Sequence, residues 1–159
     1  MRGNEYQKKA AKTWLTAGML LAVAFIMIFS VTESALCGSQ NDPEAEAVMQ
    51  AARKYLDAEV RRDYPAVYAC FAPSSSYMQT NSYEQYLAKA RLAQDRVAKY
   101  RIVAITYIKN NENRQTSATI KKIAEVEVDV TFLNIATQHR SEVNIGFIFF
   151  KEGGKWYKS

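Results

Sequence analysis

The stretch AEVEVDVTF, residues 124–132, alternates strictly between apolar and polar side chains. Successive side chains of a β-strand point to opposite faces, so this pattern predicts a half-buried strand of an antiparallel sheet. Its apolar face carries Val126, Val128, Val130 and Phe132. Its polar face carries Glu125, Glu127 and Asp129. The apolar face must be covered by other elements of the chain.

Further strands are predicted on both sides of this one. Residues 102–109 are rich in β-branched and aromatic side chains, and residues 141–151 place Val143, Ile145, Phe147 and Phe149 on one face. Glu152-Gly153-Gly154-Lys155 is typical of a tight hairpin turn, which leads into a last strand at Trp156–Tyr157. These strands follow one another closely and therefore predict an antiparallel meander.

Three helices are predicted before the sheet. Asp42 and Pro43 begin the first, over 43–61, whose apolar stripe is Val48, Ala52, Tyr55, Leu56 and Val60. Pro65 begins a second helix that runs to about residue 71, and 75–79 is predicted as a short strand. Capping boxes at 81–85 begin a third helix, to about residue 99. Helices followed by a meander predict an α+β domain with helices on one sheet face.

The run AARKYLDAEVRRDYPAVYACFAPSS, residues 51–75, is followed by a third helix and by strands closing on FKEGGKWYKS, residues 150–159. This order resembles the NTF2-like (cystatin-like) superfamily over nearly all of 43–159. The resemblance implies a cone of three N-terminal helices packed on a curved antiparallel sheet. It indicates a fold and leaves the function open, because one fold hosts many functions.

The stretch from Trp14 to Val31 is uncharged and 18 residues long, enough for a helix of about 27 Å that spans a bilayer. The basic residues Arg2, Lys8, Lys9 and Lys12 all precede it. The positive-inside rule therefore predicts a cytoplasmic tail (1–13), a transmembrane helix or signal anchor (14–31), a linker (32–42) and an extracytoplasmic domain (43–159). The expected location is the cytoplasmic (inner) membrane, crossed once.

Two alternatives for the N-terminal segment stay open. Cleavage after Ser34 would release a secreted domain, and Cys37 would be lipidated if the chain were a lipoprotein, although Ser34-Ala35-Leu36 departs from the usual box before such a cysteine. Cys37 and Cys70 could also pair in an oxidising compartment. Cys70 lies in an apolar helical run, which favours a small buried side chain.

Few residues suggest catalysis. His139, the single histidine, falls in a polar turn without acidic or cysteine neighbours, and the row Glu125, Glu127 and Asp129 belongs to the solvated face of its strand. No acid or histidine is expected on the inward face, and no cofactor or metal site is predicted. Enzymes of the resembled superfamily place polar groups inside the cone. The candidates for cavity-lining, ligand-binding residues reduce to Tyr55, Tyr86 and Tyr107.

Two functions are compatible with these features. The first is a non-enzymatic, membrane-anchored binding or assembly module of a bacterial cell envelope, similar in architecture to inner-membrane subunits of type IV secretion machines. Its partners would be the membrane and other proteins, or a second copy through the sheet. The second is a small-molecule binder or enzyme that uses the cavity of the cone. Residues 43–159 hold 17 basic and 13 acidic residues, a net charge of +4 that does not support nucleic-acid binding.

A cluster of basic residues surrounds the predicted third helix: Lys89, Arg91, Arg96, Lys99 and Arg101. On one helix face they could meet anionic lipid headgroups or an acidic partner. A solvated helix face is the simpler interpretation.

Overall fold

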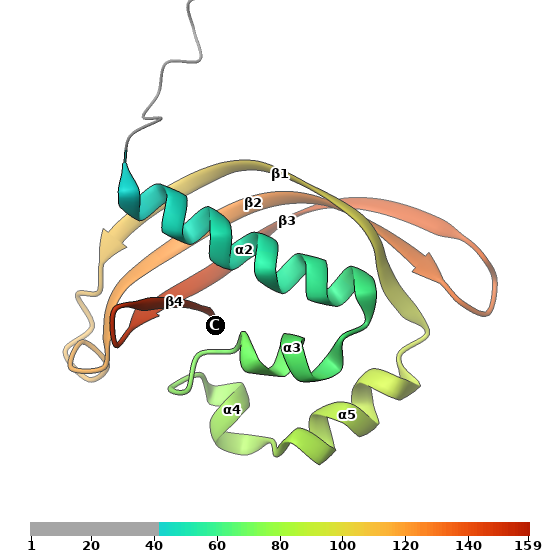
Figure 1. Cartoon of the computed structure of the whole chain (residues 1–159), viewed down its shortest axis with the longest axis horizontal. Helices are drawn as coiled ribbons and strands as arrows, with labels where there is room; N and C mark the ends of the chain where they lie inside the picture. The colour runs from blue at the N-terminus through green and yellow to red at the C-terminus, as the bar shows by residue number, and fades with distance from the viewer. Residues whose placement is uncertain (1–41) are drawn as a thin grey trace, which may run out of the picture. The chain divides into compact units, whose positions relative to one another are not determined.

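The computed structural model describes residues 42–159, and the element labels follow Figure 1. The helices are α2 (Pro43–Arg61), α3 (Tyr64–Ala69), α4 (Ser76–Thr80) and α5 (Tyr83–Leu92). The strands are β1 (Asp95–Asn110), β2 (Ile120–Asn134), β3 (Arg140–Glu152) and β4 (Lys155–Lys158). The predicted α+β class, with helices before an antiparallel sheet, is confirmed.

The four strands form one antiparallel sheet in the order β1-β2-β3-β4. The predicted strand 124–132 lies within β2, with Val128 opposite Ile102 of β1 and Ile145 of β3. Gly153 and Gly154 form the turn between β3 and β4 at φ values of 54° and 83°. Glycine adopts this left-handed conformation without the clash of a Cβ atom, which explains the Gly-Gly pair.

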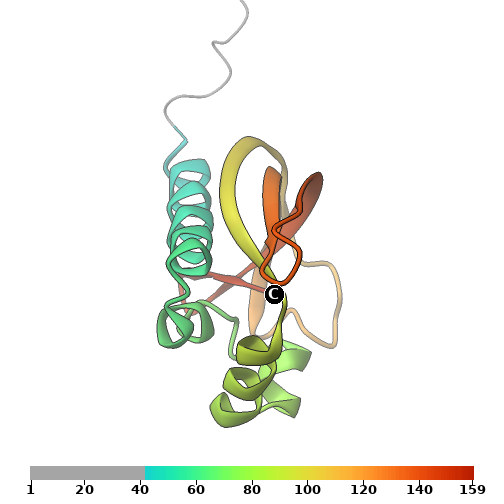
Figure 2. The ribbon, with the colours of Figure 1, turned by 90° about the vertical axis from the view of Figure 1, so that its right-hand side faces the viewer.

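Helix α2 lies along the concave face of the curved sheet, and α3, α4 and α5 lie on the side of α2 away from the crest of the sheet (Figure 1). The side view shows α2 and the sheet as two layers (Figure 2). Val48, Ala52 and Leu56 of α2 are almost fully buried, as are Val126 and Val128 of β2. This apolar contact is the core, and the curved sheet with its helices agrees with the cone that the resemblance implies.

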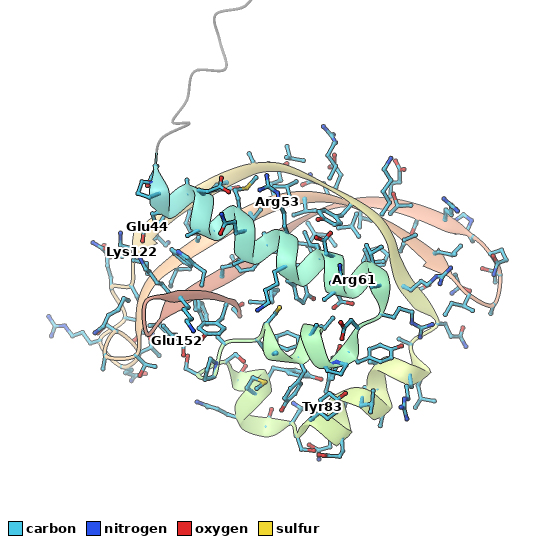
Figure 3. The ribbon with its side chains drawn as sticks, viewed as in Figure 1. Glu44, Arg53, Arg61, Tyr83, Lys122 and Glu152 are labelled. Atoms are coloured by element: carbon cyan, nitrogen blue, oxygen red, sulfur yellow. The ribbon has the colours of Figure 1, made fainter. Side chains whose placement is uncertain are left out.

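Ionic and backbone contacts hold the helical segments to the sheet. The Glu44 carboxylate accepts from the Nζ atoms of Lys122 on β2 and Lys151 on β3 (Figure 3). The backbone N–H of Lys158 donates to the Cys70 carbonyl at 2.8 Å, and that of Ala72 donates to the Lys158 carbonyl at 2.7 Å. These contacts tie α2 and the segment after α3 to the sheet.

Two predicted elements are wrong. Residues 76–80 form helix α4 in place of a strand, because the Ser75 side chain caps it by accepting from the Met78 N–H at 3.2 Å. Helix α5 ends at Leu92 in place of Lys99, since Ala93 turns the chain into an extended conformation. Residues 95–99 belong to β1, and Asp95 accepts from the Asn134 amide at 2.8 Å. The range 42–159 therefore holds four helices, one more than predicted.

The predictions for the tail, the apolar run and the linker up to residue 41, including Cys37 and its pairing with Cys70, lie outside the described residues. Within residues 42–159 no helix combines the length and apolarity that a bilayer crossing requires. Cys70 itself is buried, as predicted, and burial raises the pKa of its thiol.

Candidate functional site

A cavity of about 320 Å³ lies between the C-terminal half of α2, helix α5 and the concave face of the sheet. Leu56 on α2, Ala90 on α5, Val97 on β1 and Ile145 on β3 form apolar parts of its wall. The cone is therefore not completely filled by its own side chains. A volume of this size matches the lower end of small-molecule sites in proteins.

Aromatic residues make up half of the remaining lining: Tyr55, Tyr64, Tyr86, Phe132 and Phe147. The rings of Tyr55 and Phe147 pack with their centroids 5.9 Å apart, and Tyr64 meets Tyr86 edge to face at 6.4 Å. Such contacts hold the rings in fixed orientations. Part of the cavity wall is therefore built from aromatic rings that pack against one another.

Glu59 is the acid that α2 contributes to this cavity. Its side chain is half-buried, and burial raises the pKa of Glu59 above its ordinary value, while a hydrogen bond with Tyr55 opposes the rise. Burial, and next the charge of Glu59, raise the pKa of the Tyr55 hydroxyl. Among the described residues no lysine or arginine forms an ion pair with Glu59. The carboxylate is thus partly desolvated without a compensating cation.

Arg62 ends α2 next to this acid. It adopts the left-handed conformation with φ of 55°, which costs a residue with a Cβ atom about 1–2 kcal/mol. Its side chain is directed to Tyr64: Nε donates to the hydroxyl at 2.8 Å, and the guanidinium carbon lies 5.6 Å from the ring centroid. Strained residues of this kind concentrate at functional sites.

Two exposed charges complete the rim of the cavity. Asp95 and Arg96, at the start of β1, line it and are open to solvent. With Glu59 and Arg62, they give the cavity two acids and two bases. The rest of the lining is apolar or aromatic. Asp95 and Arg96 lie at the solvent-exposed rim of the cavity, and Glu59 and Arg62 lie at the end of α2.

The three tyrosines predicted as ligand-binding residues are not brought together. Tyr55 and Tyr86 line the cavity, and burial raises the pKa of both hydroxyls. Tyr107 lies on the other face of the sheet, opposite Glu125, with the Lys109 ammonium 4.7 Å from its ring centroid. A bulge between Ile105 and Tyr107 turns that side chain outward. A ligand-binding role for Tyr55 and Tyr86 stays a prediction.

The acidic row of β2 lies on the outer sheet face, as predicted. Asp129 pairs with Arg101 of β1 and accepts from the Asn144 amide at 2.8 Å, and these contacts, that of Asn144 first, hold its pKa below the ordinary value. Glu125 lies against Gly146, where a Cβ atom would clash with the Oε1 atom of Glu125. No cluster of acids, histidine or cysteine suited to a metal occurs among residues 42–159.

The other polar residues singled out in the sequence are dispersed. His139 is exposed in the turn before β3. The five basic residues expected around one helix are divided, because Lys89 and Arg91 lie on α5 whereas Arg96, Lys99 and Arg101 lie on β1. They therefore do not form a single helix face.

Sequence reasoning missed Glu59 as a cavity residue. The apolar stripe predicted for the first helix ended in Val60. In the structure Val60 is 38% exposed, and Glu59 faces the cavity. A signal was present: Glu59 follows Tyr55 by four residues, so the two side chains share a helix face. The left-handed conformation of Arg62 had no signal in the sequence, since such ends usually carry glycine.

No protein-family model and no curated protein matches this sequence. A solved structure with a similar fold is the ketosteroid isomerase-like protein from Erwinia carotovora atroseptica. It is 20% identical, the match covers 74% of this chain and 92% of that chain, and the TM-score is 0.47. Similarity at this level does not indicate a ligand or an activity for this chain.

What the site offers chemically is limited and specific. Tyr55 and Tyr86 present hydroxyl groups, and Glu59 presents a carboxyl group that accepts a proton more readily than an exposed glutamate does. Apart from the charged groups of Arg62, Asp95 and Arg96, the remaining wall is apolar or aromatic. This arrangement suits the binding of one compact molecule that has a polar end and an apolar body.

Proposed function

We propose that this chain is a membrane-tethered domain that binds a small, mostly apolar molecule in the cavity beside α2. The observation that carries the proposal is the cavity itself, of about 320 Å³, with Glu59 facing it and no cation paired with that acid among the described residues. A partly desolvated charge is costly for a protein that only needs to fold. Binding is the role proposed, because the lining suits a polar end and an apolar body of a ligand but indicates no bond to be made or broken.

The proposal is tested by a pair of substitutions on α5. Ala90 lines the cavity, whereas Ala88 on the same helix is exposed. Ala90→Phe places a ring in the cavity, and Ala88→Phe places the same ring in solvent. Both variants are first compared with the wild type by circular dichroism, so that a folding defect is recognised.

The probe is 1-adamantanol, a compact neutral molecule, titrated calorimetrically into the full chain in lipid nanodiscs, with empty nanodiscs as the blank. We expect saturable binding at one site for the wild type and for Ala88→Phe, and affinity reduced at least about tenfold for Ala90→Phe. Absence of saturable binding to the wild type, or equal binding by a folded Ala90→Phe, overturns the proposal.

The membrane tether rests on the uncharged stretch 14–31 and the basic residues before it. Mass spectrometry of the chain extracted from membranes tests it. An intact N-terminus supports a retained anchor in the cytoplasmic membrane. A chain that begins at a lipidated Cys37 supports the lipoprotein alternative, and a chain that begins at Ala35 and is found in the soluble fraction supports secretion.

An assembly role in a secretion machine stays a prediction by analogy of architecture. Affinity capture of the full chain from its native membrane tests it, and recovery of a stoichiometric envelope complex would support it. The same experiment tests pairing with a second copy through the sheet, because differently tagged copies would then be recovered together.

A further inference from the structure

We propose that the ligand of this cavity is an organic cation: an ammonium group carried on a compact apolar body. The inference rests on the proposed function, since it names the chemical class of the molecule bound there. Two features of the cavity, its aromatic walls and its single inner carboxylate, independently favour a positive charge over a neutral or negative one.

The aromatic walls are the first feature. Five rings line a space of about 320 Å³. The Arg62 guanidinium already lies against the ring of Tyr64, and the Lys158 ammonium lies 5.9 Å from the centroid of Phe147. The rings of Tyr55, Tyr86 and Phe132 carry no such cation among the described residues. The face of an aromatic ring is electron-rich and attracts an ammonium or alkylammonium group, most strongly where water is excluded. Proteins that bind such cations commonly surround them with several rings. An apolar body would meanwhile contact Leu56, Val97 and Ile145.

The carboxylate is the second feature. Glu59 lies between Tyr55 and Arg62 along α2, is half-buried, and has no ion-pair partner within residues 42–159. A bound ammonium group would supply the missing positive charge and donate a charge-assisted hydrogen bond. A neutral alcohol would supply only a weaker hydrogen bond, and a carboxylate would be repelled.

The arginines of the cavity do not reverse this preference. The Arg62 guanidinium is engaged with the hydroxyl and ring of Tyr64, and Arg96 lies at the exposed rim next to Asp95. Residues 43–159 carry a net charge of +4, which at long range favours anions. A measured preference for a cation would therefore come from the cavity and not from the surface of the domain.

Three molecules with one skeleton separate these effects: 1-adamantanamine, 1-adamantanol and 1-adamantanecarboxylate. Each is titrated into the full chain in zwitterionic lipid nanodiscs at pH 7.5, with empty nanodiscs as the blank. We expect the amine to bind at least about tenfold more tightly than the alcohol, and the carboxylate to bind most weakly.

The role of Glu59 is tested by Glu59→Gln, which keeps the shape and a hydrogen-bonding group but removes the charge. The matched control is Glu46→Gln, an exposed glutamate of the same helix. We expect Glu59→Gln to lower the affinity for 1-adamantanamine about tenfold and to change the affinity for 1-adamantanol less than about threefold. Glu46→Gln should change neither.

The amine should also bind more tightly as pH rises through the pKa of Glu59, because the bound cation favours the ionised carboxylate. The other titratable groups facing Glu59 are Tyr55, Tyr64 and Tyr86 on the helices, the Cys70 thiol, and Asp95 on β1, with the permanent charges of Arg62 and Arg96. Asp95→Asn therefore serves as a control, and it should keep the pH dependence that Glu59→Gln removes.

The outcomes distinguish this inference from the proposed function. If 1-adamantanol does not bind, the proposed function fails, and this inference fails with it. If the alcohol binds as tightly as the amine, or if Glu59→Gln and Glu46→Gln behave alike, the cavity binds small molecules but the cation inference is overturned. A tenfold preference for the amine that depends on Glu59 supports it.

Discussion

At one end of α2, Glu44 accepts hydrogen bonds from Lys122 and Lys151, and these two contacts lower the pKa of its carboxyl. At the other end, Glu59 is half-buried without an ion pair among the described residues, and burial raises its pKa. The two glutamates are separated by 15 residues, about 22 Å along the helix axis. Two glutamates of one helix thus lie in contrasting surroundings, one paired with cations and the other half-buried without them in the described part of the chain.

The difference separates stability from function within one helix. The Glu44 end ties α2 to β2 and β3, and its charges are satisfied by the fold itself (Figure 3). The Glu59 end holds a cavity, an uncompensated carboxylate and the strained backbone of Arg62. These three features of the Glu59 end lower the stability of the fold. Such costs are expected where residues are retained for binding.

The largest effect is expected from Glu44→Ala. It leaves two lysines, with side chains 34% and 28% exposed, facing each other without an acid. We expect a loss of about 2 kcal/mol in the free energy of unfolding, measured by urea unfolding followed by near-UV circular dichroism. Glu46→Ala, whose acid is 59% exposed, should change it by less than about 0.5 kcal/mol. Equal losses of stability in the two variants would show that the ion pairs of Glu44 do not stabilise the fold more than an exposed glutamate does.

The pH dependence of stability should differ in sign for the two acids. The pKa of Glu44 is lowered in the folded state, so its stabilisation is present above the ordinary value of 4.5 and is lost as pH falls through the folded pKa. The pKa of Glu59 is raised, so its ionised form destabilises the fold above that pKa, and the cost disappears as pH falls through it.

Two glutamine variants measure this contrast. At pH 7, Glu59→Gln should be more stable than the wild type by about 1 kcal/mol, and Glu44→Gln should be less stable. Both differences should shrink as the pH is lowered, that of Glu59 at the higher pH. If the free energy of unfolding depended on pH in the same way for all three proteins between pH 7 and pH 4, the opposite pKa shifts of Glu44 and Glu59 would be contradicted.

A smaller gain is expected from Arg62→Gly. Glycine adopts the left-handed conformation at φ of 55° without steric cost, so the variant should be more stable by about 0.5–1 kcal/mol in thermal unfolding. It also loses the contacts of the guanidinium with Tyr64 at the cavity wall. Greater stability together with altered 1-adamantanol affinity is the expected result, and a loss of stability would show that the side-chain contacts exceed the strain.

The smallest effect is expected from Tyr107→Phe. Tyr107 lies on the outer sheet face, so removing its hydroxyl should leave ligand affinity unchanged and alter the free energy of unfolding by less than about 0.5 kcal/mol. Tyr55→Phe removes the hydroxyl beside Glu59 and should weaken the binding of 1-adamantanamine. Calorimetry on the two variants compares the cavity with the outer face of the sheet.

The parts of the fold that the sequence predicts are those in which one physical signal dominates. Residues 124–132 alternate without interruption, Asp42 and Pro43 mark the start of α2, and Gly153-Gly154 suits a two-residue turn. Local competition caused the errors. Residues 95–99 have charges at helical spacing, but they pair with β2, and Ser75 caps a helix where a strand was expected.

Only part of the candidate site could be predicted from the sequence. Tyr55 and Tyr86 were candidates because no acid or histidine was expected on the inward face, and both line the cavity. Tyr107 was misplaced because alternation assumes a regular strand, and a bulge shifts the face on which every later side chain lies. Glu59 was missed because an acid near the end of a helix usually lies in solvent. The cavity itself depends on how far α2 and α5 stand from the sheet, which no local pattern encodes.

The bulges of β1 have a consequence beyond the placement of Tyr107. β1 is an edge of the sheet, 16 residues long, and its pairing with β2 is interrupted near Val97, Ile102 and Ile105. A long, regular edge invites another chain to add a strand and begin an aggregate. Irregular backbone and the charges of Lys99, Arg101 and Lys109 oppose that addition. Straightening β1 would therefore favour aggregation of the protein through this edge.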